Sequence, residues 1–230
     1  YEQFNDNRIS DRKKVVIIGS GPNRIGQGIE FDYSCVHAVK SFQSEGYEAI
    51  MINCNPETVS TDYHTADKLY IEPLTKEDVL AILKEEKPDG VVIQFGGQTP
   101  LKLVKDIEAD GYKILGTDFA TVELAENRES FGKILRELNI NAPAFGTAVF
   151  EDQALSVAKS VGYPVLVRPS YVLGGRGMKV VHSDEELCKY IRKATEISAE
   201  APVLIDKFLE NAEEFDVDAI SDGTDCVIGG

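Results

Sequence analysis

The stretch VVIIGSGPNRIGQG at residues 15–28 decides the fold of this chain. Its first part, VVIIG at 15–19, is a continuous apolar, largely β-branched run, which is typical of a central parallel strand covered on both faces. A glycine-rich turn follows at 20–28, and the pattern then becomes helical from about Ile29 to Glu45. A strand that leads through such a turn into a helix predicts the first unit of a parallel sheet.

The same alternation continues through the first 118 residues. Thr75 is a helix cap supported by Asp78, and Lys87-Pro88 closes that helix. Thr99-Pro100 is a suitable start for another helix. We predict a Rossmann-like, doubly wound parallel sheet for residues 1–118 and a helical connector for 119–142. Further strands are expected at EAIMINCN (48–55), KLYIEPL (68–74), GVVIQFGG (90–97) and KILG (113–116).

The second half of the chain has a different pattern. Short strands and two helices, expected at 151–161 and 184–198, predict a small α+β unit with an antiparallel sheet over residues 143–200. From residue 201 the pattern predicts the strands of a third unit, which the chain does not finish. Because the chain begins at Tyr1 and stops in a strand-like run, we expect both ends to be cut. The strands are expected at AFGTAVF (144–150), YPVLVRPS (163–170), KVVHS (179–183), VLIDKFL (203–209), EEFDVDAIS (213–221) and CVIGG (226–230).

Composition excludes several classes of protein. A net charge of −15 over 230 residues argues against a general nucleic-acid surface, which needs clustered Lys and Arg. No apolar run approaches the roughly 20 residues of a membrane helix, so no membrane partner is expected. The three histidines are dispersed, which argues against a metal cluster. The cysteines at 35, 54, 188 and 226 are scattered, which predicts reduced thiols and a cytoplasmic protein.

The glycine-rich turn first suggests a dinucleotide site, but three features depart from that pattern. The spacing is G-x-G-x-x-x-x-G, Pro22 lies inside the turn, and the second strand ends in Asn53-Cys54-Asn55 without the acid that binds a ribose. A Rossmann-like scaffold with a different ligand is favoured. An NAD(P)-dependent oxidoreductase domain remains an alternative, as does a non-catalytic interaction domain.

Two later segments are candidates for nucleotide binding. In RPSYVLGGRGM (168–178) a basic residue ends a strand, and a glycine hairpin follows that is able to close over phosphates with its N–H groups. The alternative is an ordinary hairpin with an arginine in a surface ion pair. VLIDKFLENAEEFDVD (203–218) can present backbone groups to an adenine and an acid to a ribose, or be a solvated acidic turn.

Together these parts follow the order found in ATP-grasp enzymes, which clamp ATP between a lid and a larger domain. More narrowly, the chain from Lys13 to Gly230 resembles the large chain of carbamoyl phosphate synthetase, in the half that phosphorylates carbamate. The motifs that carry the resemblance are GPNRIGQGIEFDYSC (21–35), NCNPETVSTDY (53–63), QFGGQTPL (94–101), AENRESF (125–131) and VRPSYVLGGRGM (167–178).

The resemblance implies roles for seven residues. Two arginines would flank the ATP phosphates, a glycine pair would belong to the lid loop, and two residues would contact adenine through their backbone. An acid would lie near the ribose, where a K⁺ ion is also possible in this family. These residues are, in that order, Arg128 and Arg168, Gly174 and Gly175, Lys207 and Leu209, and Glu214.

The resemblance also implies cofactors and partners. Mg²⁺ or Mn²⁺ would be held by side chains beyond residue 230, so residues 1–230 alone are expected to have little or no activity. The partners would be the rest of the large chain and a glutaminase, either a small subunit or a fused domain. Loop residues Arg24, Glu30, Asn55, Glu57 and Gln98 would hold carbamate, line its route or satisfy backbone groups, and we favour the last role.

Overall fold

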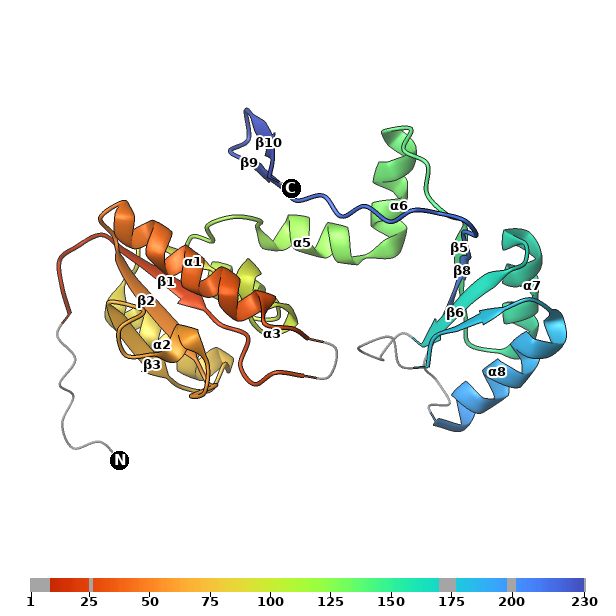
Figure 1. The fold of residues 1–230 in the computed structure, drawn as a ribbon, viewed down its shortest axis with the longest axis horizontal. Helices are drawn as coiled ribbons and strands as arrows, with labels where there is room; N and C mark the ends of the chain where they lie inside the picture. Colours follow the sequence, from red (N-terminus) through yellow and green to blue (C-terminus); the bar gives the residue numbers. More distant parts are fainter. Residues whose placement is uncertain (1–8, 25–26, 170–176, 198–201, 230) are drawn as a thin grey trace. The chain divides into compact units, whose positions relative to one another are not determined.

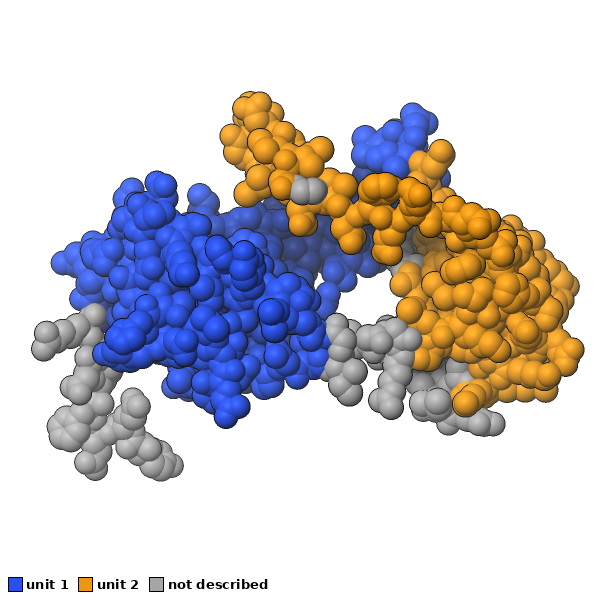
Figure 2. Space-filling model, in the orientation of Figure 1, with its two compact units in different colours: residues 1–140 blue, residues 141–230 orange. Residues whose placement is uncertain are grey.

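The computed structural model describes residues 9–24, 27–169, 177–197 and 202–229. The chain divides into two compact units, residues 1–140 and 141–230, which Figure 2 colours separately. Among the described residues, no helix is both long enough and apolar enough to span a bilayer.

The first unit is built on a four-stranded parallel sheet (Figure 1). The strand order β3-β2-β1-β4 puts β1 at the centre, and the five residues of β1 are all buried. The Rossmann-like, doubly wound sheet predicted from the sequence is therefore confirmed. The strands are β1 (Lys14–Ile18), β2 (Glu48–Asn53), β3 (Lys68–Ile71) and β4 (Gly90–Val92).

Helices cover both faces of this sheet because four consecutive residues of β1, Val15 to Ile18, are apolar and point alternately to the two faces. Val15 and Ile17 pack with α1 (Glu30–Ser44), whereas Val16 and Ile18 pack with α2 (Lys76–Glu86) and α4 (Val104–Ala109). Each fully buried aliphatic side chain contributes about 1.5–3 kcal/mol. As predicted, Thr75 caps α2 by accepting from the Asp78 N–H, and the helix ends at Lys87 with a left-handed φ of 50°.

The last part of this unit differs from the sequence prediction. Strand β4 stops at Val92, and a short 3₁₀ helix follows at Gln94–Gly96. The chain is tightly packed there, since a Cβ on Gly96 would lie 2.7 Å from the carbonyl oxygens of Ile18 and Gly19. The expected strand at 113–116 is reduced to one bridge between Ile114 and Val91. Helix α3 (Gln98–Leu101) begins one residue before Thr99, with Gly97 and not Thr99 as its cap residue.

The expected helical connector consists of two helices, α5 (Phe119–Glu126) and α6 (Arg128–Glu137). Asn127 separates them, and its side chain caps α6 by accepting from the Ser130 N–H. A further 3₁₀ helix, η1 (Val59–Thr61), follows β2.

The second unit contains an antiparallel sheet of order β5-β8-β6-β7 with two helices beside it (Figure 1). The strands are β5 (Phe145–Ala148), β6 (Val165–Pro169), β7 (Lys179–Val181) and β8 (Val203–Lys207), and the helices are α7 (Glu151–Val161) and α8 (Asp184–Ile197). One face of the sheet, including Val167 and Ile205, forms a core with Ala154 and Ala158 of α7 and Leu187 of α8.

Strand β8 lies in a different place from the one that the sequence suggested. The pattern predicted it as the opening of a third unit, whereas it pairs with β5 on one side and with β6 on the other. After it, the expected strand at 213–221 is limited to β9 (Ala219–Ser221), which forms a separate antiparallel pair with β10 (Cys226–Ile228). All six residues of β9 and β10 are exposed.

Candidate nucleotide site

Arg168 is held beside an acidic residue of the neighbouring strand. Its Nε donates to Asp206 Oδ2 over 3.0 Å, and the side chains are 34% and 15% exposed, respectively. In the antiparallel register Leu166 faces Asp206, and Arg168 is two residues further along β6. Arg168 and Asp206 therefore lie on the same face of the sheet.

That face is opposite to the core of the unit. The alternate residues Val165 and Val167 of β6, with Val203 and Ile205 of β8, pack against α7 and α8. The sequence raised an ion-paired arginine as the alternative to phosphate binding, and an ion pair is present. However, the hydrogen bond to Asp206 engages Nε, and a guanidinium has further N–H donors on its two terminal nitrogens. The ion pair and a phosphate contact are thus compatible.

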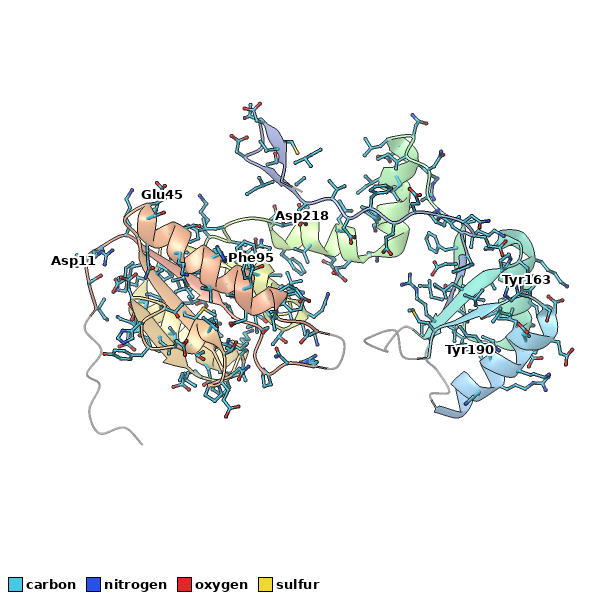
Figure 3. The ribbon with its side chains drawn as sticks, in the orientation of Figure 1. Asp11, Glu45, Phe95, Tyr163, Tyr190 and Asp218 are labelled. Carbon is cyan, nitrogen blue, oxygen red and sulfur yellow. The ribbon has the colours of Figure 1, made fainter. Side chains whose placement is uncertain are left out.

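Lys207 ends β8 with both its backbone and its side chain engaged. Its N–H donates to the Ala144 carbonyl over 2.8 Å. Its Nζ donates to the carbonyls of Gly162 and Tyr163 over 2.9 and 2.8 Å (Tyr163 is labelled in Figure 3). Any contact between adenine and the Lys207 backbone must therefore use its carbonyl, while the side chain secures the end of β8 to the turn before β6.

The other predicted site residues are only partly described. Gly174 and Gly175 lie outside the described residues. Arg128 is the first residue of α6, in the first unit, and its side chain is not described. Leu209 is 56% exposed and Glu214 is exposed, both in the segment after β8. The structure thus brings Arg168 and Lys207 onto neighbouring strands of one sheet.

Asn53 organises the loops at the carboxyl edge of the parallel sheet. This residue, 1% exposed, accepts at Oδ1 from the N–H groups of Gly21 and Cys54 and donates from Nδ2 to Ser60. An ideal Cβ on Gly19 would lie 2.6 Å from the Asn53 amide, so the two residues are in close contact. Asn53 occupies the strand end where a dinucleotide site would carry an acid, and it uses a glycine-loop N–H that would otherwise face a phosphate.

The remaining loop residues mostly serve their own loops. Glu30 Oε1 accepts from the Gly28 N–H, and Asn55 Oδ1 accepts from the Glu57 N–H. Gln98 Nε2 donates to Glu126 Oε1 over 3.4 Å, and Arg24 is exposed. These contacts agree with the structural role that the sequence favoured for this group.

Neither Asp206 nor Asn53 was assigned a role from the sequence. The signal for Asp206 was the period-two alternation of VLIDK, which puts its carboxylate and the core side chains on opposite faces. Burial raises the pKa of Asp206, and the Arg168 charge and hydrogen bond offset only part of that effect. Among the described residues, no group of three or more His, Cys, Asp and Glu is placed to hold a metal ion.

Comparison with known proteins identifies the family and the fold. Residues 11–124 match the model of the carbamoyl phosphate synthase preATP-grasp domain, and residues 127–229 match the ATP binding domain of the carbamoyl-phosphate synthase L chain. Biotin carboxylase from Campylobacter jejuni, solved as a β-γ-ATP complex, has a TM-score of 0.68 at 17% identity, with 94% of this chain and 50% of that chain covered. The two family models and the fold thus define a protein of the ATP-grasp class.

Two relatives identify the family within that class. The carbamoyl phosphate synthase large chain, C-terminal section, of Aquifex aeolicus is 61% identical over 217 residues, which cover 94% of this chain and 40% of the relative. The large chain of Archaeoglobus fulgidus is 57% identical over 230 residues, all of this chain and 21% of the relative. The chain belongs to the carbamoyl phosphate synthase large-chain family and spans 40% or less of these relatives.

Proposed function

We propose that this chain supplies the ATP-binding part of the second synthetase half of a carbamoyl phosphate synthase, where ATP phosphorylates carbamate. A carbamate oxygen attacks the γ-phosphorus, the bond to the β,γ-bridging oxygen breaks, and carbamoyl phosphate and ADP result. Two comparisons support this assignment: the match of residues 127–229 to the ATP binding domain and the similarity to a C-terminal section. ATP and carbamate are the small-molecule partners.

The observation that carries the proposal is the arginine at the end of β6. Arg168 is fixed through Nε, so its terminal nitrogens are available to bridge phosphate oxygens as a fork. Arg128, at the amino terminus of α6, would supply a second charge. Positive charge stabilises the negative charge spread over a transferring phosphoryl group, which is the main catalytic contribution in such reactions. Gly174 and Gly175 would close over the phosphates and exclude water.

The end of β8 suits the adenosine part of the nucleotide. The Lys207 carbonyl would accept from the adenine amino group and the Leu209 N–H would donate to the ring. The Lys207 N–H is already bonded to Ala144, which leaves the carbonyl as the backbone contact. Glu214, exposed in the segment after β8, would lie near the ribose, with K⁺ as a possible neighbour.

The metal and the protein partners come from outside residues 1–230. The resemblance to the family implies that Mg²⁺ or Mn²⁺ would be held by side chains in other parts of the large chain. When bound, the metal would offset part of the negative charge on the transferring phosphoryl group. A glutaminase, separate or fused, would supply ammonia. Free cysteines at all four positions suit the cytoplasm.

The test is Arg168→Ala in the full-length large chain, assayed by ATP formation from ADP and carbamoyl phosphate. This reverse reaction isolates carbamate phosphorylation from the earlier steps. We expect a loss of about 10²–10³-fold in kcat, the usual effect of removing a group that stabilises transition-state charge. The matched control is Arg192→Ala, which breaks an ion pair with Glu151 on the helical side of the same unit and should leave the rate unchanged.

Unchanged ATP formation in Arg168→Ala would refute the proposal. Tight binding of NADH without binding of ATP would instead favour an oxidoreductase domain. Absence of nucleotide-dependent protection from hydrogen exchange around residues 168–178 would favour an interaction domain.

A further inference from the structure

Asp206 stands beside the proposed phosphate-binding arginine and not among the residues that would touch the nucleotide. Its carboxylate accepts from the Nε of Arg168, the nitrogen nearest the aliphatic part of the side chain. A bond at Nε fixes the plane of the guanidinium, because rotation about the last side-chain torsion would break it. The N–H donors on the other edges of the guanidinium are then held in one orientation.

The register of the sheet places Asp206 where it can hold the plane of the Arg168 guanidinium. Leu166 is its partner on β6 and Phe145 is its partner on β5, so Asp206 lies on an inner strand with a neighbour on each side. Strand β8 is anchored further by Ile205 in the core and by the Lys207 side chain on the turn before β6. The carboxylate is therefore carried by a rigid element, whereas Arg168 leads into the glycine-rich segment.

A carboxylate at position 206 is not expected to add much to the stability of the second unit. Asp206 is only 15% exposed, and a partly buried ion pair often contributes no more than a well-packed apolar pair, since both groups lose water. The alternate positions of β8, Val203 and Ile205, already supply the packing of the strand. The ion pair is therefore weak evidence for a stabilising role, and its contact at Nε points to the orientation of Arg168.

We propose that Asp206 is a positioning residue that aims the Arg168 guanidinium at the nucleotide phosphates. This inference rests on the proposed function, because it assigns Asp206 an effect on catalysis through Arg168. Without the carboxylate, Arg168 would regain rotamer freedom and present its charge in several orientations. Since small misplacements of a catalytic group reduce rates by up to about 10²-fold, the effect of losing Asp206 is measurable.

The test is a double-mutant cycle in the full-length large chain, with kcat and KM for ADP measured in ATP formation from carbamoyl phosphate. We expect Asp206→Ala to lower kcat/KM by about 10–100-fold and Asp206→Glu to recover part of it. In the Arg168→Ala background, Asp206→Ala should have no further effect. Glu151→Ala, which removes the acid of the Arg192 ion pair in the same unit, is the control and should leave both constants unchanged.

The possible outcomes separate a failure of the proposed function from a failure of the positioning role of Asp206. If Arg168→Ala leaves the kinetics unchanged, the proposed function fails and this inference with it. If Arg168→Ala is slow but Asp206→Ala is not, only the inference fails. Multiplicative losses in the double variant would show a structural role and also overturn it. Should Asp206→Ala not fold, Asp206→Asn keeps the size and an acceptor oxygen, and the same absence of a further effect in the Arg168→Ala background is required.

Discussion

Replacement of Glu86 by glutamine should destabilise the first unit by about 3 kcal/mol at neutral pH. The Glu86 side chain is fully buried at the carboxyl end of α2. Its Oε2 accepts from Lys14 over 3.0 Å, and its Oε1 accepts from Lys68 over 2.6 Å and from the Tyr70 hydroxyl. Lys14 lies on β1 and Lys68 on β3, so one carboxylate joins two strands to a helix.

The magnitude follows from the pKa of this carboxyl group. Burial alone would raise it, but the hydrogen bonds from Lys68, Tyr70 and Lys14 outweigh burial and lower the pKa of Glu86 from 4.5 to about 2. At about 1.4 kcal/mol per pKa unit, this difference corresponds to about 3 kcal/mol. Removing the charge would also leave a buried ammonium group (Lys14) and a half-buried one (Lys68) facing a neutral amide, and breaking buried pairs typically costs about 3–5 kcal/mol.

The assay is hydrogen exchange of the peptides that contain β1 and β2, measured on residues 1–230. A loss of about 3 kcal/mol should accelerate their exchange by about 100-fold. Glu77→Gln is the matched control, because it makes the same chemical change at an exposed position of α2 and should cost less than about 1 kcal/mol. Equal exchange rates in the two variants would contradict the reasoning.

The Glu86 carboxyl group also makes the free energy of unfolding depend on pH. Because the folded-state pKa of Glu86 is depressed, its contribution to the free energy of unfolding is present above pH 4.5 and is lost as the pH falls toward 2. The difference in exchange between the natural protein and Glu86→Gln should therefore narrow steadily below pH 4.5. A difference that stayed constant to pH 2 would exclude the charge as its source.

Three other substitutions have specific expected outcomes. Asn127→Ala removes the cap of α6 and should cost about 1 kcal/mol, seen as faster exchange in the first turn of that helix. Lys207→Met should lower the free energy of unfolding by about 1–3 kcal/mol and weaken ATP binding, measured by titration, because Nζ no longer secures β8. Gly96→Ala should cost about 1–3 kcal/mol in urea unfolding, since its Cβ would meet backbone oxygens at 2.7 Å.

The sequence predicted the elements whose signal is local. Helix α7 has the expected bounds, Glu151–Val161, and α1 begins one residue after the expected Ile29. Both have a strong apolar period with turn residues at their ends. The strand at 113–116 was wrong because its apolar run is only two residues, too short to decide between a strand and a single bridge.

Long-range pairing was beyond sequence reasoning. The position of β8 between β5 and β6 depends on pairings across roughly forty to sixty residues, as in Arg168 with Leu204 and Phe145 with Asp206. Nothing in VLIDK itself identifies those partners. For the same reason Arg168 was found as a candidate from its own motif, whereas the partner of its Nε could be named only once the register was known.

The position of β8 has a consequence for how substitutions in it should be interpreted. Val203 and Ile205 point into the core of the second unit, whereas Asp206 points to the opposite face and contacts Arg168. A cavity made at Ile205 would therefore shift the strand that carries Asp206, and a loss of activity there would not identify a nucleotide contact. Since Asp206 projects away from the helices, its replacement can impair the site without opening the core. Measurements of unfolding and of kinetics on variants at both positions are thus needed to separate packing from orientation within one strand.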